Sequence, residues 1–121
     1  MRKNIIISFL FVLLLTGCSN LLSSANNKAK FERLLSDDEY TYSLFIASPR
    51  ELITLNILEE NNITNVSRIQ HEELQYIDKE YKFLKINRSP SFLVFDNKEM
   101  IYMTENQSDL VNFLQNTKNK E

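Results

Sequence analysis

The stretch Arg88-Ser89-Pro90-Ser91-Phe92 turns the chain from a polar corner into an apolar run that continues to Phe95. A second apolar run, Met100 to Met103, follows the polar connection Asp96-Asn97-Lys98-Glu99. Two short apolar runs separated by a polar turn are typical of a β-hairpin. The sequence therefore predicts a corner at Pro90 and then two antiparallel strands.

Upstream of this corner, Tyr40 to Ala47 is rich in aromatic and aliphatic residues and becomes continuously apolar, which predicts a strand entering a covered sheet. It runs into Ser48-Pro49-Arg50-Glu51, where serine can cap helix amides, proline suits the first helical position and glutamate can bond back to the cap. We therefore expect a helix that starts at Ser48 and ends at Asn61-Asn62. Its apolar face comprises Leu52, Leu55 and Leu58.

Three further elements complete the pattern. Ile63 to Gln70 reads as a strand too polar for a secure central position, and the β-α-β order predicts that it pairs parallel to the first strand. A helix is expected from Glu72 because apolar residues recur there at three- and four-residue steps. Ser108 can cap a final helix. The expected fold class is α/β, with the order β-α-β-α-β-β-α and a central mixed sheet flanked by helices. The repeating apolar residues of the middle helix are Leu74, Ile77, Tyr81 and Leu84.

In this order and spacing, residues 39–117 resemble the minimal thioredoxin fold. The resemblance rests on the apolar strand that runs into Ser48, the corner Ser89-Pro90-Ser91, and the hairpin opening Phe92-Leu93-Val94-Phe95-Asp96. It implies that Pro90 matches the family's cis-proline, and that Ser48, Ser89 and Pro90 border a groove for an extended peptide. The alternative is that Pro90 only shapes a turn or packs the corner.

The resemblance also bears on catalysis. Thioredoxin-family oxidoreductases carry a C-x-x-C pair where the first strand meets the helix, because the helix N-terminus stabilises the attacking thiolate. Here those positions hold Ser48-Pro49-Arg50-Glu51. A serine hydroxyl cannot replace a redox-active sulfur, so we expect no dithiol exchange and no enzyme activity from this chain.

The N-terminal segment predicts where the protein works. Arg2 and Lys3 precede an apolar run from Ile5 to Leu15, which is the anatomy of a signal peptide. The next residues complete Leu15-Thr16-Gly17-Cys18, which resembles a bacterial lipobox. The resemblance implies cleavage after residue 17, a diacylglyceryl group on Cys18, and anchoring at the extracytoplasmic face of the bacterial cell membrane. The alternative is an uncleaved apolar helix with an incidental cysteine. We assign residues 1–17 to the signal peptide, 18–38 to the lipidated cysteine and a flexible tether with a short helix, and 118–121 to a polar tail.

Composition excludes several functions for the processed chain. Fourteen basic residues lose Arg2 and Lys3, which leaves twelve against sixteen acidic residues and a formal charge of −4. This balance argues against a nucleic-acid partner. Gly17 is the only glycine, so glycine-rich phosphate loops are absent, and Cys18 is the only cysteine. His71, the only histidine, has no cysteine neighbour, and we expect a residue at the surface or a helix start rather than a metal ligand. No catalytic residues, metal or cofactor are expected.

Two functions from different classes remain. The first is a lipid-anchored, non-redox binding domain associated with the cell envelope or peptidoglycan, whose partner is the cell wall or an envelope protein. The alternative is an accessory protein that presents thiol-containing peptides to a separate extracytoplasmic oxidoreductase, and it predicts peptide binding that Pro90→Ala abolishes. The sequence leaves the oligomeric state open.

Overall fold

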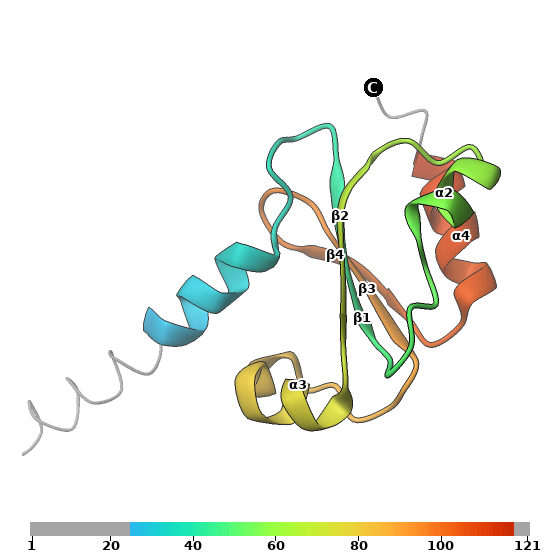
Figure 1. Cartoon of the computed structure of the whole chain (residues 1–121). Coiled ribbons are helices and arrows are strands. Elements are labelled where there is room, and N and C mark those ends of the chain that lie inside the picture. The colour runs from blue at the N-terminus through green and yellow to red at the C-terminus, as the bar shows by residue number, and fades with distance from the viewer. Residues whose placement is uncertain (1–24, 118–121) are drawn as a thin grey trace, which may run out of the picture. The chain divides into compact units, whose positions relative to one another are not determined.

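The computed structural model describes residues 25–117, of which residues 25–34 are helical. The chain divides at Glu32, and the folded domain lies beyond that residue. Figure 1 shows helices on both sides of a single sheet, α2 and α4 on one side and α3 on the other. The predicted α/β fold class, with its thioredoxin-like order of elements, is confirmed. The elements are β1 (Tyr42–Ala47), α2 (Leu55–Glu60), β2 (Val66–Glu72), α3 (Leu74–Glu80), the 3-10 helix η1 (Lys82–Leu84), β3 (Ser91–Phe95), β4 (Met100–Thr104) and α4 (Gln107–Asn116).

The sheet has the strand order β2-β1-β3-β4. β1 pairs parallel with β2, with Ile46 opposite His71, and antiparallel with β3, with Ile46 opposite Phe92. β3 and β4 form the predicted antiparallel hairpin. In its turn the Asp96 carboxylate accepts hydrogen bonds from the amides of Lys98 and Glu99, both at 2.7 Å. The polar strand β2 lies at an edge of the sheet, in agreement with its composition.

The main core lies between the sheet and the helices α2 and α4. Leu44 and Ile46 of β1 alternate toward this side, and they pack with Leu58 of α2 and Leu110 and Leu114 of α4. All five side chains are buried. Burial of each such side chain contributes about 1.5–3 kcal/mol, so this layer supplies much of the stability of the domain.

The opposite face of the sheet is covered by α3 and η1. Phe45 of β1 alternates to this side and meets the Tyr81 ring edge-on, with ring centroids 5.1 Å apart. Ile77 is the fully buried side chain of α3. Arg68 of β2 donates to the carbonyls of Arg33 and Leu35, which ties the start of the domain to the edge strand.

The first helix starts later than the sequence predicts. Ser48 does not cap a helix, since the chain after it is irregular up to residue 54. Its amide donates to the Glu72 carbonyl at 2.9 Å and so continues the pairing of β1 with β2. Its hydroxyl accepts from the Arg50 amide at 3.1 Å in a local turn. The helix begins after Thr54, whose hydroxyl oxygen accepts from the Ile57 amide at 3.2 Å. Residues 48–54 are therefore irregular chain rather than helix.

Two other predicted boundaries shift for similar reasons. The helix expected from Glu72 is shorter, because β2 extends through that residue, and it is followed by η1. The cap of α4 is Asn106 rather than Ser108, since the Asn106 side chain accepts from the Asp109 amide at 3.2 Å. Within the segment assigned to the tether, residues 25–34 are helical. The signal peptide with its lipobox Leu15-Thr16-Gly17-Cys18 and the polar tail 118–121 lie outside the described residues.

Candidate functional site

The three residues predicted to border a groove lie at the same end of the sheet. The Ser89 hydroxyl donates to the Ala47 carbonyl at 3.2 Å, which brings the proline corner to the end of β1, directly before Ser48. The peptide bond between Ser89 and Pro90 is cis, as the resemblance implies. Ser48 is only 5% exposed and its hydroxyl is engaged by the Arg50 amide, so this side chain supports the local turn.

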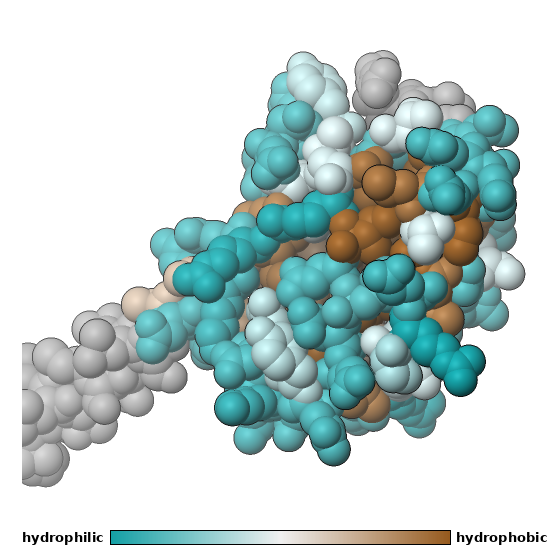
Figure 2. Space-filling model, viewed as in Figure 1, coloured by the Kyte–Doolittle hydropathy of each residue, from teal (hydrophilic) through white to brown (hydrophobic). Residues whose placement is uncertain are grey.

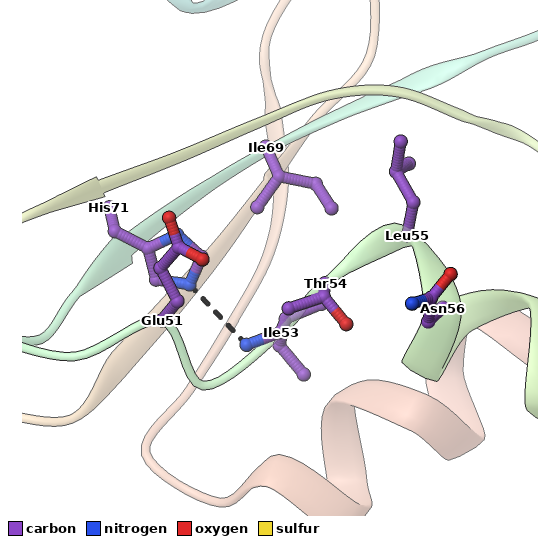
Figure 3. Close-up of a pocket in the computed structure, with 7 residues that line it drawn as sticks. All are labelled: Glu51, Ile53, Thr54, Leu55, Asn56, Ile69 and His71. Atoms are coloured by element: carbon purple, nitrogen blue, oxygen red, sulfur yellow. Dashed lines mark hydrogen bonds between the residues drawn. The ribbon is translucent and has the colours of Figure 1, made fainter.

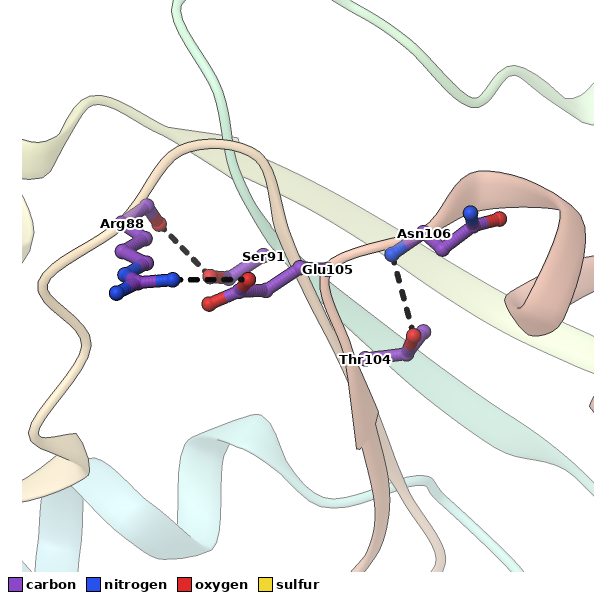
Figure 4. A network of polar contacts seen from close by, with 5 residues as sticks. All are labelled: Arg88, Ser91, Thr104, Glu105 and Asn106. Carbon is purple, nitrogen blue, oxygen red and sulfur yellow. Dashed lines mark hydrogen bonds and ion pairs between the residues drawn. The ribbon is translucent and has the colours of Figure 1, made fainter.

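The proline corner is further fixed by a small polar network (Figure 4). The Ser91 hydroxyl donates to the Arg88 carbonyl at 2.7 Å. The Arg88 guanidinium faces the Glu105 carboxylate at 3.7 Å, with both side chains largely exposed. Ion pairs at such exposed positions contribute at most about 1 kcal/mol. The network therefore shapes the corner and offers no set of groups converging on a ligand.

A hollow of about 470 Å³, here called the end pocket, lies where the parallel strands β1 and β2 end. In open α/β sheets this is the edge where ligands usually bind, because the loops after neighbouring strands diverge there. Three glutamates and one arginine contribute to its wall, so its charge is predominantly negative. The lining residues are Ser48, Pro49, Arg50, Glu51, His71, Glu72, Glu73 and Tyr76.

A second hollow of about 280 Å³, here called the side pocket, lies beside β2 (Figure 3). Glu51 and His71 line both hollows, so the two are neighbours. Figure 3 shows that the side pocket lies between β2 and the chain that leads into α2. Its volume suits one or two side chains rather than a larger ligand. The lining residues are Glu51, Ile53, Thr54, Leu55, Asn56, Ile69 and His71.

His71 connects two parts of the wall of the side pocket by a hydrogen bond. Its Nε2 atom accepts a hydrogen bond from the Ile53 amide at 3.4 Å, which requires that nitrogen to be unprotonated. Burial lowers the pKa of His71 from its ordinary value of 6.5, and the nearby Glu51 carboxylate opposes that effect. The neutral imidazole therefore links β2 to the irregular segment 48–54. The histidine lies in β2 and is partly buried, whereas the sequence places it at the surface or at a helix start.

The late start of α2 is what leaves this part of the sheet open. α2 has only six residues, and Ile69 of the edge strand β2 is partly buried against the core and lines the side pocket. Leu55 at the start of α2 is 61% exposed. Figure 2 shows apolar surface gathered on the side of the domain where α2 lies. The site therefore combines a hollow partly lined by aliphatic side chains with an acidic rim.

The chemical groups that line the two hollows are mainly carboxylate, hydroxyl and aliphatic side chains, together with the His71 imidazole. Within residues 25–117 no group of three histidine, cysteine, aspartate or glutamate side chains could hold a metal ion. Ser48, the one buried hydroxyl of the end pocket, has its oxygen turned to a backbone amide rather than to a general base. Aliphatic side chains such as Leu55 and Ile69 beside the Glu51 carboxylate are suited to contact side chains of a peptide.

Sequence reasoning found only part of this site. Ser48 lines the end pocket, whereas Ser89 and Pro90 line neither hollow. The sequence missed Glu51 and His71, which lie 20 residues apart and meet at the ends of the two parallel strands. The signal that could have found them is the β-α-β pattern itself, since residues that follow parallel strands gather at one edge of a sheet.

No family model, no curated protein and no solved structure matches the chain. Of the helices in the described residues, none has the length and apolar content needed to cross a membrane.

Proposed function

We propose that this protein is an extracytoplasmic lipoprotein, anchored through a lipid on Cys18, whose thioredoxin-like domain acts by binding. The single observation that supports binding is the open, acidic-rimmed site at the ends of β1 and β2, where redox members of the fold carry their two cysteines. In this chain Ser48-Pro49-Arg50-Glu51 occupies that position without forming a helix, so neither the thiols nor the helix N-terminus that activates them is there.

The anchor rests on the sequence of the N-terminal segment. A cationic start, an apolar run and Leu15-Thr16-Gly17-Cys18 form one continuous pattern. Two acyl chains bind a membrane stably, because each buried methylene contributes about 0.8 kcal/mol. A domain held at the extracytoplasmic face of the cell membrane is then in reach of the components of the cell envelope.

The partner proposed is peptidoglycan or a protein of the cell envelope. The test is co-sedimentation of the purified full chain, in a neutral detergent, with cell walls isolated from the source bacterium. We expect retention on the walls that falls when Glu51 is changed to lysine and persists when the exposed Glu60 is changed in the same way. Failure of the unmodified chain to sediment with the walls would remove the proposal of wall association.

The anchor has its own test in cells. Cys18→Ala should move the protein from the membrane fraction to the soluble fraction, or leave it unprocessed, while Ser19→Ala should change neither behaviour. If the Cys18→Ala protein is processed and retained in the membrane like the unmodified chain, the lipid anchor is refuted.

A further inference from the structure

The outer edge of β2 is unpaired among the described residues, because β2 ends the order β2-β1-β3-β4. The Glu72 carbonyl accepts from the Ser48 amide, so the backbone of Glu72 faces β1. Backbone groups alternate in direction along a strand. The amides and carbonyls of Ile69 and His71 therefore face outward, away from the sheet.

These two outward-facing residues also line the side pocket. Ile69 and His71 pair with Leu44 and Ile46 of β1, and both β1 residues belong to the core that α2 and α4 cover. The side chains of Ile69 and His71 thus lie on the α2 side of the sheet, in the wall of the 280 Å³ hollow, with Leu55 across it. An open backbone edge therefore coincides with a side-chain-sized hollow whose wall carries the aliphatic side chains of Ile53, Leu55 and Ile69 beside polar groups.

The charges around this edge select the kind of ligand. Glu51 lies at the rim of the side pocket, and Glu72 and Glu73 lie at the end of the strand. Arg50 is the one basic residue that lines either of these two hollows. On the other face of β2, the Glu72 carboxylate accepts a hydrogen bond from the Gln70 side-chain amide at 3.2 Å.

We propose that β2 accepts an extended, basic segment of a partner polypeptide as a fifth strand of the sheet. Apolar side chains of the segment enter the side pocket. The alternating lysine or arginine side chains point to the other face of β2, where Glu72 lies, and they are also attracted by the negative charge of Glu51 and Glu73 at the strand end. Main-chain hydrogen bonds to Ile69 and His71 supply affinity, and the pocket and the charges supply specificity. This inference rests on the proposed binding function and names the chemistry of its partner.

The probe is a fluorescent hexapeptide of alternating valine and lysine, titrated against the full chain in neutral detergent micelles. A valine-glutamate hexapeptide is the charge control, and a peptide with three valines followed by three lysines is the pattern control. Fluorescence anisotropy should show saturable binding of the alternating basic peptide, at least about tenfold tighter than binding of either control. The acidic rim repels the valine-glutamate peptide. The peptide with three valines followed by three lysines cannot place all its valines on one face of the bound strand.

Hydrogen exchange measured by NMR locates the bound peptide. The peptide should slow exchange of the Ile69 and His71 amides at least tenfold and leave the outer edge of β4 unchanged. Slowing confined to β4, or none at either edge, would overturn the proposal. Slowing at β2 that appears without peptide and rises with protein concentration would also overturn it, because a second copy of the chain would then occupy the edge.

Two pairs of variants test the pocket and the rim separately. Leu55→Lys should weaken peptide binding at least threefold, while Tyr40→Lys, at a residue of similar exposure (64%), should not. Glu51→Lys should weaken binding about three- to tenfold, whereas Glu60→Lys should have no effect. Equal effects within either pair would contradict the assigned site.

The outcome separates this inference from the broader function. A chain that sediments with cell walls but shows no peptide-induced protection of β2 refutes the fifth strand and leaves the binding function standing. A chain that neither sediments with walls nor binds the peptide refutes both.

Discussion

Substitution of Ile77 by alanine should lower the free energy of unfolding by about 3 kcal/mol. Ile77 is the fully buried side chain of α3, the helix that covers the face of the sheet carrying Phe45. The change removes three carbon atoms at about 0.8 kcal/mol each, which accounts for about 2.4 kcal/mol. The cavity left under a seven-residue helix supplies the rest.

Urea unfolding followed by circular dichroism measures this loss. For a domain of this size the urea dependence is about 1–2 kcal/mol per molar, so the midpoint should fall by about 1.5–3 M. Asp78→Ala, at the exposed neighbouring position, should change the free energy by less than about 0.5 kcal/mol. A loss below about 1 kcal/mol for Ile77→Ala would refute the packing of α3 on the sheet.

Three further predictions concern single groups. Because burial lowers the pKa of His71, the unfolded chain binds more protons than the folded chain just below pH 6.5. The free energy of unfolding should therefore fall as the pH drops through that interval. The difference between the urea midpoints at about pH 7.5 and about pH 5.5 should be larger for the unmodified chain than for His71→Gln. Asn106→Ala should cost about 1 kcal/mol in urea unfolding through loss of the α4 cap, and Ser108→Ala should cost less than about 0.5 kcal/mol. Lys85 has a φ of 55°, in the left-handed region, so Lys85→Gly should relieve up to about 1 kcal/mol of backbone strain and raise the thermal midpoint of unfolding. A lower midpoint would contradict the left-handed conformation.

Local sequence signals were sufficient where one physical requirement dominated. The run Phe92 to Phe95 is apolar at every position, and all four side chains are buried in the centre of the sheet. The polar turn at Asp96 allows only a short connection, so the next run pairs with it. Strand identity and hairpin pairing followed from these two facts.

The first residue of a helix was harder to predict, because several residues in the same stretch could act as its N-terminal cap. Ser48 has a good local sequence for a cap, yet the pairing of β1 with β2 continues through its amide and the chain then turns at Arg50 instead of entering a helix. A hydrogen bond to a strand 24 residues away along the chain cannot be read from a local pattern. The helix therefore has its cap at residue 54 instead of 48, six residues later, and residues from the irregular segment before it line the side pocket.

The site was only partly predictable for the same reason. Ser48 was found because the fold resemblance marks the end of β1. Glu51 and His71 are ordinary polar residues in the sequence, and they acquire a role only because the late helix start leaves them on the wall of a hollow. The exposure of Leu55 likewise follows from the position of the helix, since the same residue would face the core of a helix begun at Ser48.

The most direct test of the account is the intact mass of the protein extracted from bacterial membranes. The account predicts a chain that begins at Cys18 and carries a diacylglyceryl group, with every residue from 1 to 17 removed. An unmodified chain that retains residues 1–17, or a processed chain without lipid, would contradict the claim that this binding domain works from a lipid anchor outside the cytoplasm.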